Sequence, residues 1–479
     1  MHKTITMKRL FTFSAALLAA AVLHAQEVAS DSTAAPAPQQ DTTQTAAQEE
    51  APKKAAKKFP PRMEYDRSSL AMCMIYHQED EFGAAIDSAY HAMPFPDKYD
   101  DHNIGLERID NSLFTGVQKG NKAGLIKAQY GKKLNAKDLE KNAAAIEKLI
   151  NDNRIANYML AKWFGLFEGD TCNLDLVFYR GQYNATELDL ALAGQTKNGM
   201  EKLMDTGMDL IGNSYLLVND MTYATAEERA QAAKVALAVI GGLFDAIMGT
   251  DLGRNVAQVG GAIADGFTGF AVKNHSYLFR LNWNEELRAI FENEYWMTEP
   301  DPAKLDKFLK DERFTMKYVA HEYECSEKTV AKGKKVDREK LIKMVCTRSI
   351  DKNIAALQLQ YEDFKVKTPV YEEVFNEKGK SLGYAVKIGL KEGISEKSTF
   401  QVVRKEEDPE THQVKYRYIA TLKPVKGKIW DNRFMAAEDD DNKNKAAAAL
   451  TYTLMKKASG GQVLPGMLVI EGKYSKVQQ

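Results

Sequence analysis

Ser214-Tyr215-Leu216-Leu217-Val218 follows Gly212 and carries no charge, so it predicts a short buried strand. In residues 277–283, Tyr, Phe, Leu and Trp side chains alternate with Leu278, Arg280 and Asn282, and this two-residue period is that of a strand with one buried face. We expect these two strands to share one sheet. Residues 314–323 form a candidate further strand of the same region.

Helical periodicity surrounds these strands. A helix is expected from near Asn135 to just before Gly165, because its apolar residues recur at three- and four-residue spacings. A second long helix is capped by Asp337 and keeps the same spacing to Phe364. Residues 61–192 as a whole, including the apolar run that ends at Ile75, are interpreted as mostly helical.

A glycine-rich segment separates the two strands. Thr225 and Glu228 form a capping box, and residues 231–249 and 255–272 are rich in Ala, Gly, Val and Ile. Glycine at this density permits close backbone approach, so we predict a tightly packed helical hairpin. The glycines proposed for an interaction surface are Gly260, Gly261, Gly266 and Gly269. Charged residues interrupt the apolar runs, which favours packing on protein over insertion into lipid.

From about residue 367 the pattern changes to short strands broken by glycines, which is typical of a small β-barrel or sandwich. The predicted fold class is therefore α+β: a helix-rich N-terminal part with a small sheet and a glycine-rich helical hairpin, followed by a C-terminal small β-barrel or sandwich. The expected parts are a helical region (61–192), an α/β region (193–366) and a small β domain (367–479).

The first 25 residues have the pattern of an export signal. Three basic residues precede the apolar run Leu10–Leu23, and small Ala25 follows, so cleavage is expected between Ala25 and Gln26. The run is too short to span a membrane. We therefore expect an exported protein, periplasmic or associated with the outer membrane, with no transmembrane helix in the mature chain.

Residues 26–60 are rich in Ala, Thr, Gln, Pro and Glu and have no apolar period, so they are expected to form a disordered linker. Asp31-Ser32-Thr33 and Asp41-Thr42-Thr43 resemble the short acceptor used by Bacteroidota-type bacteria for O-glycosylation. Ser32 and Thr42 are the candidate sites, and an unmodified spacer is the alternative.

The composition excludes several classes of protein. Of 479 residues, 44% are hydrophobic and 27% charged, which are ordinary globular values, so the chain is neither wholly disordered nor a disulfide scaffold. Its net charge of −1 includes basic residues of the signal, so the mature chain is slightly acidic and gives no reason to expect nucleic acid as a partner. Familiar motifs of hydrolases, zinc proteases, dinucleotide-binding enzymes and thiol oxidoreductases do not occur in it. We predict no catalytic residue, no metal ligand and no cofactor.

Two features remain as candidate sites. Trp430 lies next to Asp431-Asn432-Arg433, and an aromatic ring beside donors and acceptors at a barrel turn is suited to stacking on a sugar or anchoring a peptide. Trp430 and Arg433 are therefore candidates, although core packing of Trp430 is the alternative. Cys325 and Cys346 are close enough in sequence for a disulfide, which an exported protein permits but does not require.

Several segments resemble known groups of proteins. The signal, Pro94–His102, Asn213–Asp220 and His275–Trp283 resemble an uncharacterised group of exported envelope proteins of Bacteroidota-type bacteria. Residues 393–403 are similar to the small C-terminal β-barrels of flagellar and curli-type envelope assembly factors. The first resemblance implies a compartment and no activity, and the second implies a small sheet after an α/β domain.

The function that these features favour is a non-catalytic envelope protein that binds another envelope protein or assembles with itself. A glycan- or ligand-binding protein is a second possibility, and it would use Trp430 and the aromatic strand at 277–283. A membrane-inserting oligomer and an enzyme whose site has no recognisable motif are also compatible with the sequence.

Overall fold

The structure is a computed structural model. Contacts divide the chain into two units, Met1–Lys57 and Lys58–Gln479, and every described residue belongs to the second. The described residues are 68–127, 133–169, 171–177, 210–225, 228, 267–331, 337–364, 368–407, 414–439, 442 and 444–471.

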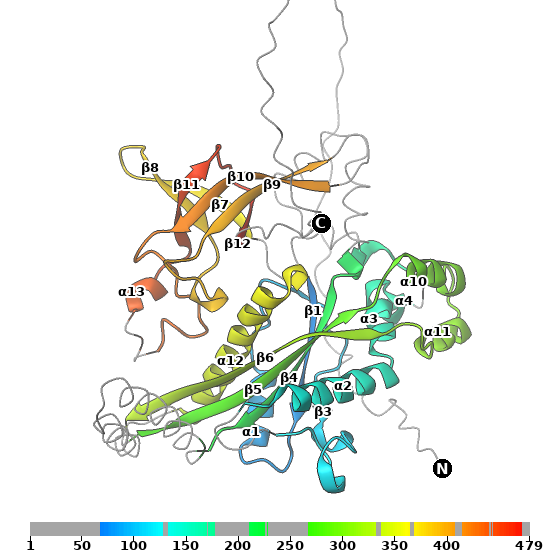
Figure 1. Cartoon of the computed structure of the whole chain (residues 1–479). Coiled ribbons are helices and arrows are strands. Elements are labelled where there is room, and N and C mark those ends of the chain that lie inside the picture. The colour runs from blue at the N-terminus through cyan, green and yellow to red at the C-terminus, as the bar shows by residue number, and fades with distance from the viewer. Residues whose placement is uncertain are drawn as a thin grey trace, which may run out of the picture. The chain divides into compact units, whose positions relative to one another are not determined.

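A mixed sheet organises the part before residue 364. Its strand order is β2-β1-β4-β5-β6, and β3 also pairs with β1 (Figure 1). Strand β1 runs parallel to β2, β3 and β4, whereas β5 is antiparallel to both β4 and β6. The six strands are β1 (Ser69–Tyr76), β2 (Asp100–Asp101), β3 (Arg108–Asp110), β4 (Ser214–Tyr223), β5 (Phe267–Leu281) and β6 (Met316–Ala331).

Strand β4 is the most completely buried strand of this sheet. Its first eight residues are all buried, and they alternate between the cores on the two faces of the sheet. Each fully buried Leu or Val side chain stabilises the fold by roughly 1.5–3 kcal/mol. The pairing of Leu216 with Phe279 and of Phe279 with Tyr318 confirms that the predicted strands share one sheet.

The prediction that residues 61–192 are mostly helical is wrong for Ser69–Tyr76, which form β1. This segment, Ser-Leu-Ala-Met-Cys-Met-Ile-Tyr, contains Leu, Ala and Met, which are good helix formers, and it shows no two-residue period. The period is missing because β1 is covered on both faces, with Cys73 facing one core and Met74 the other. A strand buried on both sides reads as a continuous apolar run.

Helices cover both faces of the sheet (Figure 1). On one face α12 packs along β5 and β6 and contacts α1, and on the other α2 and α3 cover a core that includes Ile146 and Trp163. The helices are α1 (Gly83–His91), η2 (Asn111–Leu113), η3 (Lys119–Asn121), α2 (Ala136–Asp152), α3 (Ile155–Trp163), α4 (Leu166–Gly169), α10 (Glu285–Ile290), η5 (Phe291–Tyr295), α11 (Pro302–Leu309), α12 (Arg338–Gln360), η6 (Glu362–Phe364), η7 (Leu390–Glu392) and α13 (Lys445–Ala448).

The helix starts follow their capping residues. Asn135 and Asp337 each accept a hydrogen bond from the backbone N–H three residues later, as expected of N-caps. The predicted capping box is confirmed, since Thr225 and Glu228 exchange side-chain-to-backbone hydrogen bonds. The single helix predicted from Asn135 to Gly165 is instead two helices. Arg154 has a left-handed backbone (φ 59°), and this conformation ends α2 and begins α3.

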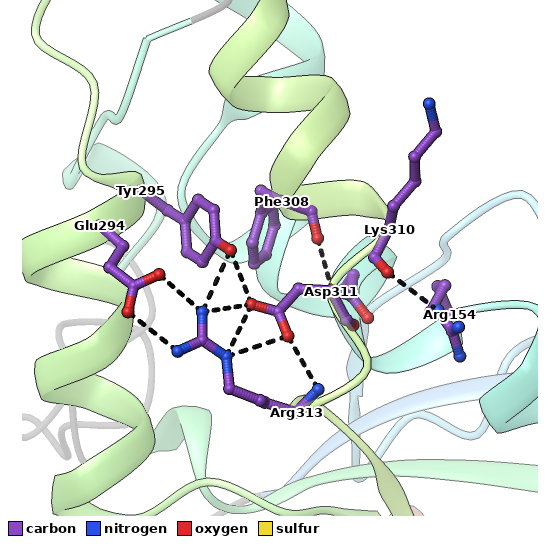
Figure 2. Close-up of polar contacts among 8 residues, drawn as sticks. Arg154, Glu294, Tyr295, Phe308, Lys310, Asp311 and Arg313 are labelled. Carbon is purple, nitrogen blue, oxygen red and sulfur yellow. Dashed lines mark hydrogen bonds and ion pairs between the residues drawn. The ribbon is translucent and has the colours of Figure 1, made fainter.

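A polar corner joins η5 and α11 to the start of β6. Figure 2 shows the guanidinium of Arg313 between the carboxylates of Glu294 and Asp311, with Tyr295 donating its hydroxyl to Asp311 at 2.6 Å. The hydrogen bonds to Glu294 and Asp311 raise the pKa of Arg313 above its ordinary value. The corner fixes the turn that leads into β6.

The C-terminal part is a closed barrel with the strand order β10-β11-β8-β7-β12-β9. Its own core includes Val386, Phe400 and Leu422. Of the two predicted forms, barrel and sandwich, the barrel is therefore the one that forms. Its strands are β7 (Thr368–Phe375), β8 (Ser381–Val386), β9 (Phe400–Glu407), β10 (Val414–Pro424), β11 (Thr453–Gly460) and β12 (Leu468–Glu471).

The predicted glycine-rich helical hairpin is wrong at its C-terminal end. Residues 267–272 belong to β5, and Gly269 pairs with Thr329 of β6. This end carries Phe267, Phe270 and Val272, and aromatic and β-branched side chains favour strands. The hairpin residues Gly260, Gly261 and Gly266 lie outside the described residues.

We predict that a fragment of residues 366–479 folds alone, because the barrel closes on itself and has its own core. Its circular dichroism should show β-structure and a cooperative thermal transition. The same fragment with Val402→Asp, which puts a charge into that core, should lack both. A wild-type fragment that resembles the Val402→Asp fragment would mean that the barrel needs α12 for its stability.

Candidate functional site

Three neighbouring strands place polar side chains in one row on the face of the sheet that α2 covers. Asp220 of β4 pairs with His275 of β5, which in turn pairs with Tyr323 of β6. His77 directly follows β1 and reaches Asp220, with 2.5 Å between Nε2 and Oδ1. The row therefore runs across the sheet from the end of β1 to its edge at β6.

The His77–Asp220 pair is buried, with exposures of 4% and 6%. Burial by itself raises the pKa of Asp220, but the contact with His77 lowers it below the ordinary value. The other ring nitrogen of His77, Nδ1, is buried and has no hydrogen-bond partner in the described part of the chain. Removing one partner of a buried hydrogen bond leaves the other unsatisfied, which is destabilising, so each residue holds the other in place.

Two further histidines continue the row. Nδ1 of His275 and Nε2 of His321 are 2.9 Å apart, and their rings stack with centroids at 5.1 Å. Burial lowers the pKa of His275 to about 4 and that of His321 to about 3, so both are neutral near pH 7. One ring then donates the shared proton and the other accepts it.

One thiol, that of Cys73, lies on the same face of the sheet as this row. This thiol is fully buried, and burial raises its pKa to about 12. It is therefore protonated at neutral pH and is a poor nucleophile. Among the described residues, no group of three or more His, Cys, Asp or Glu side chains is suited to holding a metal ion. The row instead links four strands through buried polar contacts.

The row ends at the outer edge of β6, a strand of 16 residues at one end of the strand order. At the start of β6, side chains of α2 form hydrogen bonds with the backbone groups on this outer edge. Asn151 pairs with both backbone groups of Met316 at 2.8 and 3.0 Å, and Glu147 accepts the N–H of Tyr318 at 3.1 Å. These side chains take the place that a neighbouring strand would occupy.

Beyond Tyr318 the pairing with β5 shifts register by one residue, and no described strand pairs with the outer edge over residues 319–326. In the described ranges the backbone there receives one contact from outside the β5 pairing, from the strand's own Glu322 carboxylate to the N–H of Tyr323 at 3.3 Å. Because N–H directions alternate along a strand, the N–H of Cys325 points the same way as that of Tyr323. An unpaired edge of this kind is a template for an added strand.

Acidic side chains gather along the open edge. Glu322, Glu324 and Glu327 lie within six residues of β6. On the side of α12, Glu324 pairs with Lys352 at 2.6 Å and Glu322 accepts a hydrogen bond from Gln360. Side chains of α12 thus engage two of these glutamates, Glu322 and Glu324.

The candidate residues Trp430 and Arg433 lie in a segment without regular structure between β10 and α13. The carbonyl of Trp430 accepts the N–H of Leu390, and its own N–H donates to Thr453, so its backbone is part of the barrel. Arg433 donates to Asp431 twice at 2.8 Å and lines a cleft beside α12. The structure thus places Arg433, but not Trp430, at the wall of this cleft.

The aromatic strand proposed for glycan binding is buried. Tyr277 and Phe279 are both 0% exposed and belong to the core under α2. They are therefore unable to stack on a sugar. The alternation of residues 277–283 predicted a strand with one buried face, and Tyr277 and Phe279 lie on such a face of β5.

The disulfide suggested for Cys325 and Cys346 is not formed, and both are free cysteines. Cys346 is buried among the apolar residues of α12 that face the sheet, whereas Cys325 is exposed on β6. Sequence proximity did not show that one thiol would point into a core and the other toward solvent.

Four predicted positions near the N-terminus lie outside the described residues: Ala25, Gln26, Ser32 and Thr42. None of the described helices is long and apolar enough to cross a membrane.

The sequence analysis missed the open edge of β6, because it treated residues 314–323 only as an optional strand and did not predict the order of strands in the sheet. The high charge of Glu322, Glu324 and Glu327 within a strand pattern is the signal that suggests an edge.

No protein-family model matches the chain, and no curated protein matches it.

We predict that acidification destabilises the fold through its buried histidines. The folded-state pKa of His275 is about 4, compared with about 6.5 in an unfolded chain. The unfolded state therefore binds the proton first, and stability is lost as the pH falls from 6.5 toward 4, by about 1.5 kcal/mol for this residue between pH 6.5 and 5. Urea unfolding at pH 7, 6 and 5 measures this loss. His275→Gln should show a shallower pH dependence, and an unchanged dependence would contradict the assignment.

Proposed function

We propose that this chain is a non-catalytic, exported envelope protein that binds another envelope protein by adding an extended segment of it to β6. The observation that carries the proposal is the outer edge of β6 at residues 319–326, which no described strand pairs with. The start of the same edge is different, because side chains of α2 already accept the N–H groups of Met316 and Tyr318. Backbone hydrogen bonds along such an edge supply affinity, and alternate side chains of the partner supply specificity.

Charge favours a basic segment of a different protein over a second copy of this chain. If two copies paired antiparallel about Tyr323, Glu322 of one would face Glu324 of the other, and like charges directly opposite are destabilising. A strand with Lys or Arg at these positions would instead meet opposite charges. We therefore commit to a lysine- or arginine-bearing extended segment as the occupant.

Export is part of the proposal and rests on the first 25 residues. The expected mature N-terminus is Gln26, because small Ala25 closes the basic and apolar pattern before it. N-terminal sequencing or peptide mass mapping of the protein extracted from its native envelope should find Gln26, open or cyclised. A mature protein that begins at Met1 would contradict export by this signal.

The edge is tested by two substitutions at Cys325, an exposed position of β6. Cys325→Pro removes the outward N–H and obstructs an added strand, while proline at a solvent-facing edge position leaves the β5 pairing in place. Cys325→Ser removes only the thiol. Tagged mature protein is recovered from the native envelope, and co-purifying proteins are quantified by mass spectrometry. We expect recovery of the partner to fall at least fivefold for Cys325→Pro and to be unchanged for Cys325→Ser.

The charge argument has its own pair of variants. Glu324→Lys reverses a charge on the edge and should lower recovery of the same partner, whereas Glu377→Lys reverses an exposed charge in the β7–β8 turn and should not. Circular dichroism of each variant checks the fold. Equal recovery with Cys325→Pro and Cys325→Ser, or loss with both, would show that the partner does not use the β6 edge.

A further inference from the structure

A second feature, which adjoins the β6 edge at Ser326, is a cleft of about 430 Å³ between α12, the end of β6 and the loops around η7 and Arg433. This volume lies in the range of sites that hold small organic molecules. Five cationic side chains line it: Lys328, Arg348, Lys352, Lys391 and Arg433. Two carboxylates, Glu327 and Asp351, are also in its wall.

The cations are held in place by carboxylates behind them. Arg348 donates Nη1 to Asp439 at 3.0 Å and Nε to the carbonyl of Phe434 at 3.0 Å, and Lys328 donates to the same Asp439 at 2.7 Å. Lys391 pairs with Asp97 at 2.7 Å. Side chains fixed in this way lose little freedom when they meet a ligand, which favours binding.

Two side chains of the cleft wall each have a polar atom without a hydrogen-bond partner among the described residues. Nη2 of Arg348 is buried and makes no hydrogen bond, although the other two nitrogens of that guanidinium do. Oγ of Ser326 is likewise unpartnered, in a residue only 5% exposed. Both atoms are buried, and buried polar atoms are normally satisfied, so two unpartnered donors on residues of one cleft wall point to an acceptor supplied by a ligand.

The rest of the wall is apolar. Met344 and Val345 of α12 lie on one side, and Leu390 and Ile394 of the barrel loops lie on the other. A ligand of this cleft therefore meets hydrogen-bond donors and ion-paired cations at one part and aliphatic surface at another.

We propose that this cleft binds a small organic anion, a carboxylate or phosphate group carried on a short apolar body, with Arg348 Nη2 and Ser326 Oγ as donors to its oxygens. Bonds from a guanidinium to an oxyanion are among the stronger hydrogen bonds in proteins. The apolar body packs against Met344, Val345, Leu390 and Ile394.

Asp351 gives the site a dependence on pH. Burial raises the pKa of this carboxyl to about 6, and Lys391, Glu392, Asp97 and Arg348 are the charged groups that act on it. Below pH 6 the carboxyl becomes neutral, and a negative charge is removed from the wall. A bound anion is then repelled less, so affinity should rise as the pH falls through 6.

Calorimetric titration of the mature protein tests the proposal, with benzoate, phenyl phosphate, inorganic phosphate and neutral benzyl alcohol as probes. We expect benzoate or phenyl phosphate to bind, and comparison of these two identifies the preferred head group. Inorganic phosphate, which lacks the apolar body, should bind at least tenfold more weakly than the better probe. Benzyl alcohol should not bind.

Variants assign the site. Ser326→Ala removes one unpartnered hydroxyl, and Arg348→Lys keeps a cation for Asp439 while removing Nη2, so each should retain the fold and weaken the better probe about tenfold. Lys148→Gln on α2, outside the cleft, is the matched control and should bind the probe like the wild type.

The pH dependence is tested with benzoate, which stays ionised from pH 5.5 to 7.5. Benzoate should bind more tightly at pH 5.5 than at pH 7.5, and Asp351→Asn should remove this difference in affinity.

Several results would overturn the proposal. Failure of both benzoate and phenyl phosphate to bind would do so, as would equal binding by benzyl alcohol. Unchanged affinity in folded Ser326→Ala and Arg348→Lys would also do so, because it would place the anion elsewhere. Circular dichroism and the Tm of each variant establish whether it is folded. The test of the β6 edge uses different residues and a protein partner, so either proposal can fail alone.

Discussion

The burial of β4 on both faces is the constraint on which the remaining elements depend. Its eight buried residues need a neighbouring strand on each side and a helical layer above and below. Parallel β1 and antiparallel β5 supply the strands, and α12 and α2 belong to the two layers. Because a two-faced sheet of this kind has both surfaces covered, its edges are what remain for another molecule. Of the two strands at the ends of the strand order, β6 has 16 residues and β2 has two, so β6 offers the longer edge.

Local chemistry made part of the fold predictable from the sequence. Asn135 and Asp337 cap helices, and Thr225 and Glu228 exchange hydrogen bonds, all within four residues, so the sequence alone identifies these bonds. Strand β1 was missed because its run of Leu, Ala and Met favours a helix, and only pairing with β4 makes it a strand. Gly269 was likewise assigned to a helix, and its place in a strand follows from pairing with β6, which is distant in sequence.

The candidate sites were less predictable, because they depend on which elements become neighbours. The high charge of residues 322–327 was visible in the sequence, but that β6 is the last strand of the sheet follows only from the pairing order. Arg433 was identified beside an aromatic residue, yet the surface it helps to form comes from α12 and β6. Likewise, the separation of Cys325 from Cys346 follows from the side of β6 that faces α12, which spacing in sequence does not encode.

The most direct test of the central claim, that the outer edge of β6 is open to a partner, is residue-resolved hydrogen exchange on the isolated protein. Backbone N–H groups alternate in direction along β6, so Glu322 and Glu324 should be protected by β5 while Tyr323 and Cys325 exchange much faster. We expect this alternation between residues 320 and 326, beyond the register shift of the β5 pairing at Val319, and we expect it to disappear when the partner binds. Equal, strong protection of all four N–H groups in the isolated protein would show that the edge is already covered and would contradict the claim.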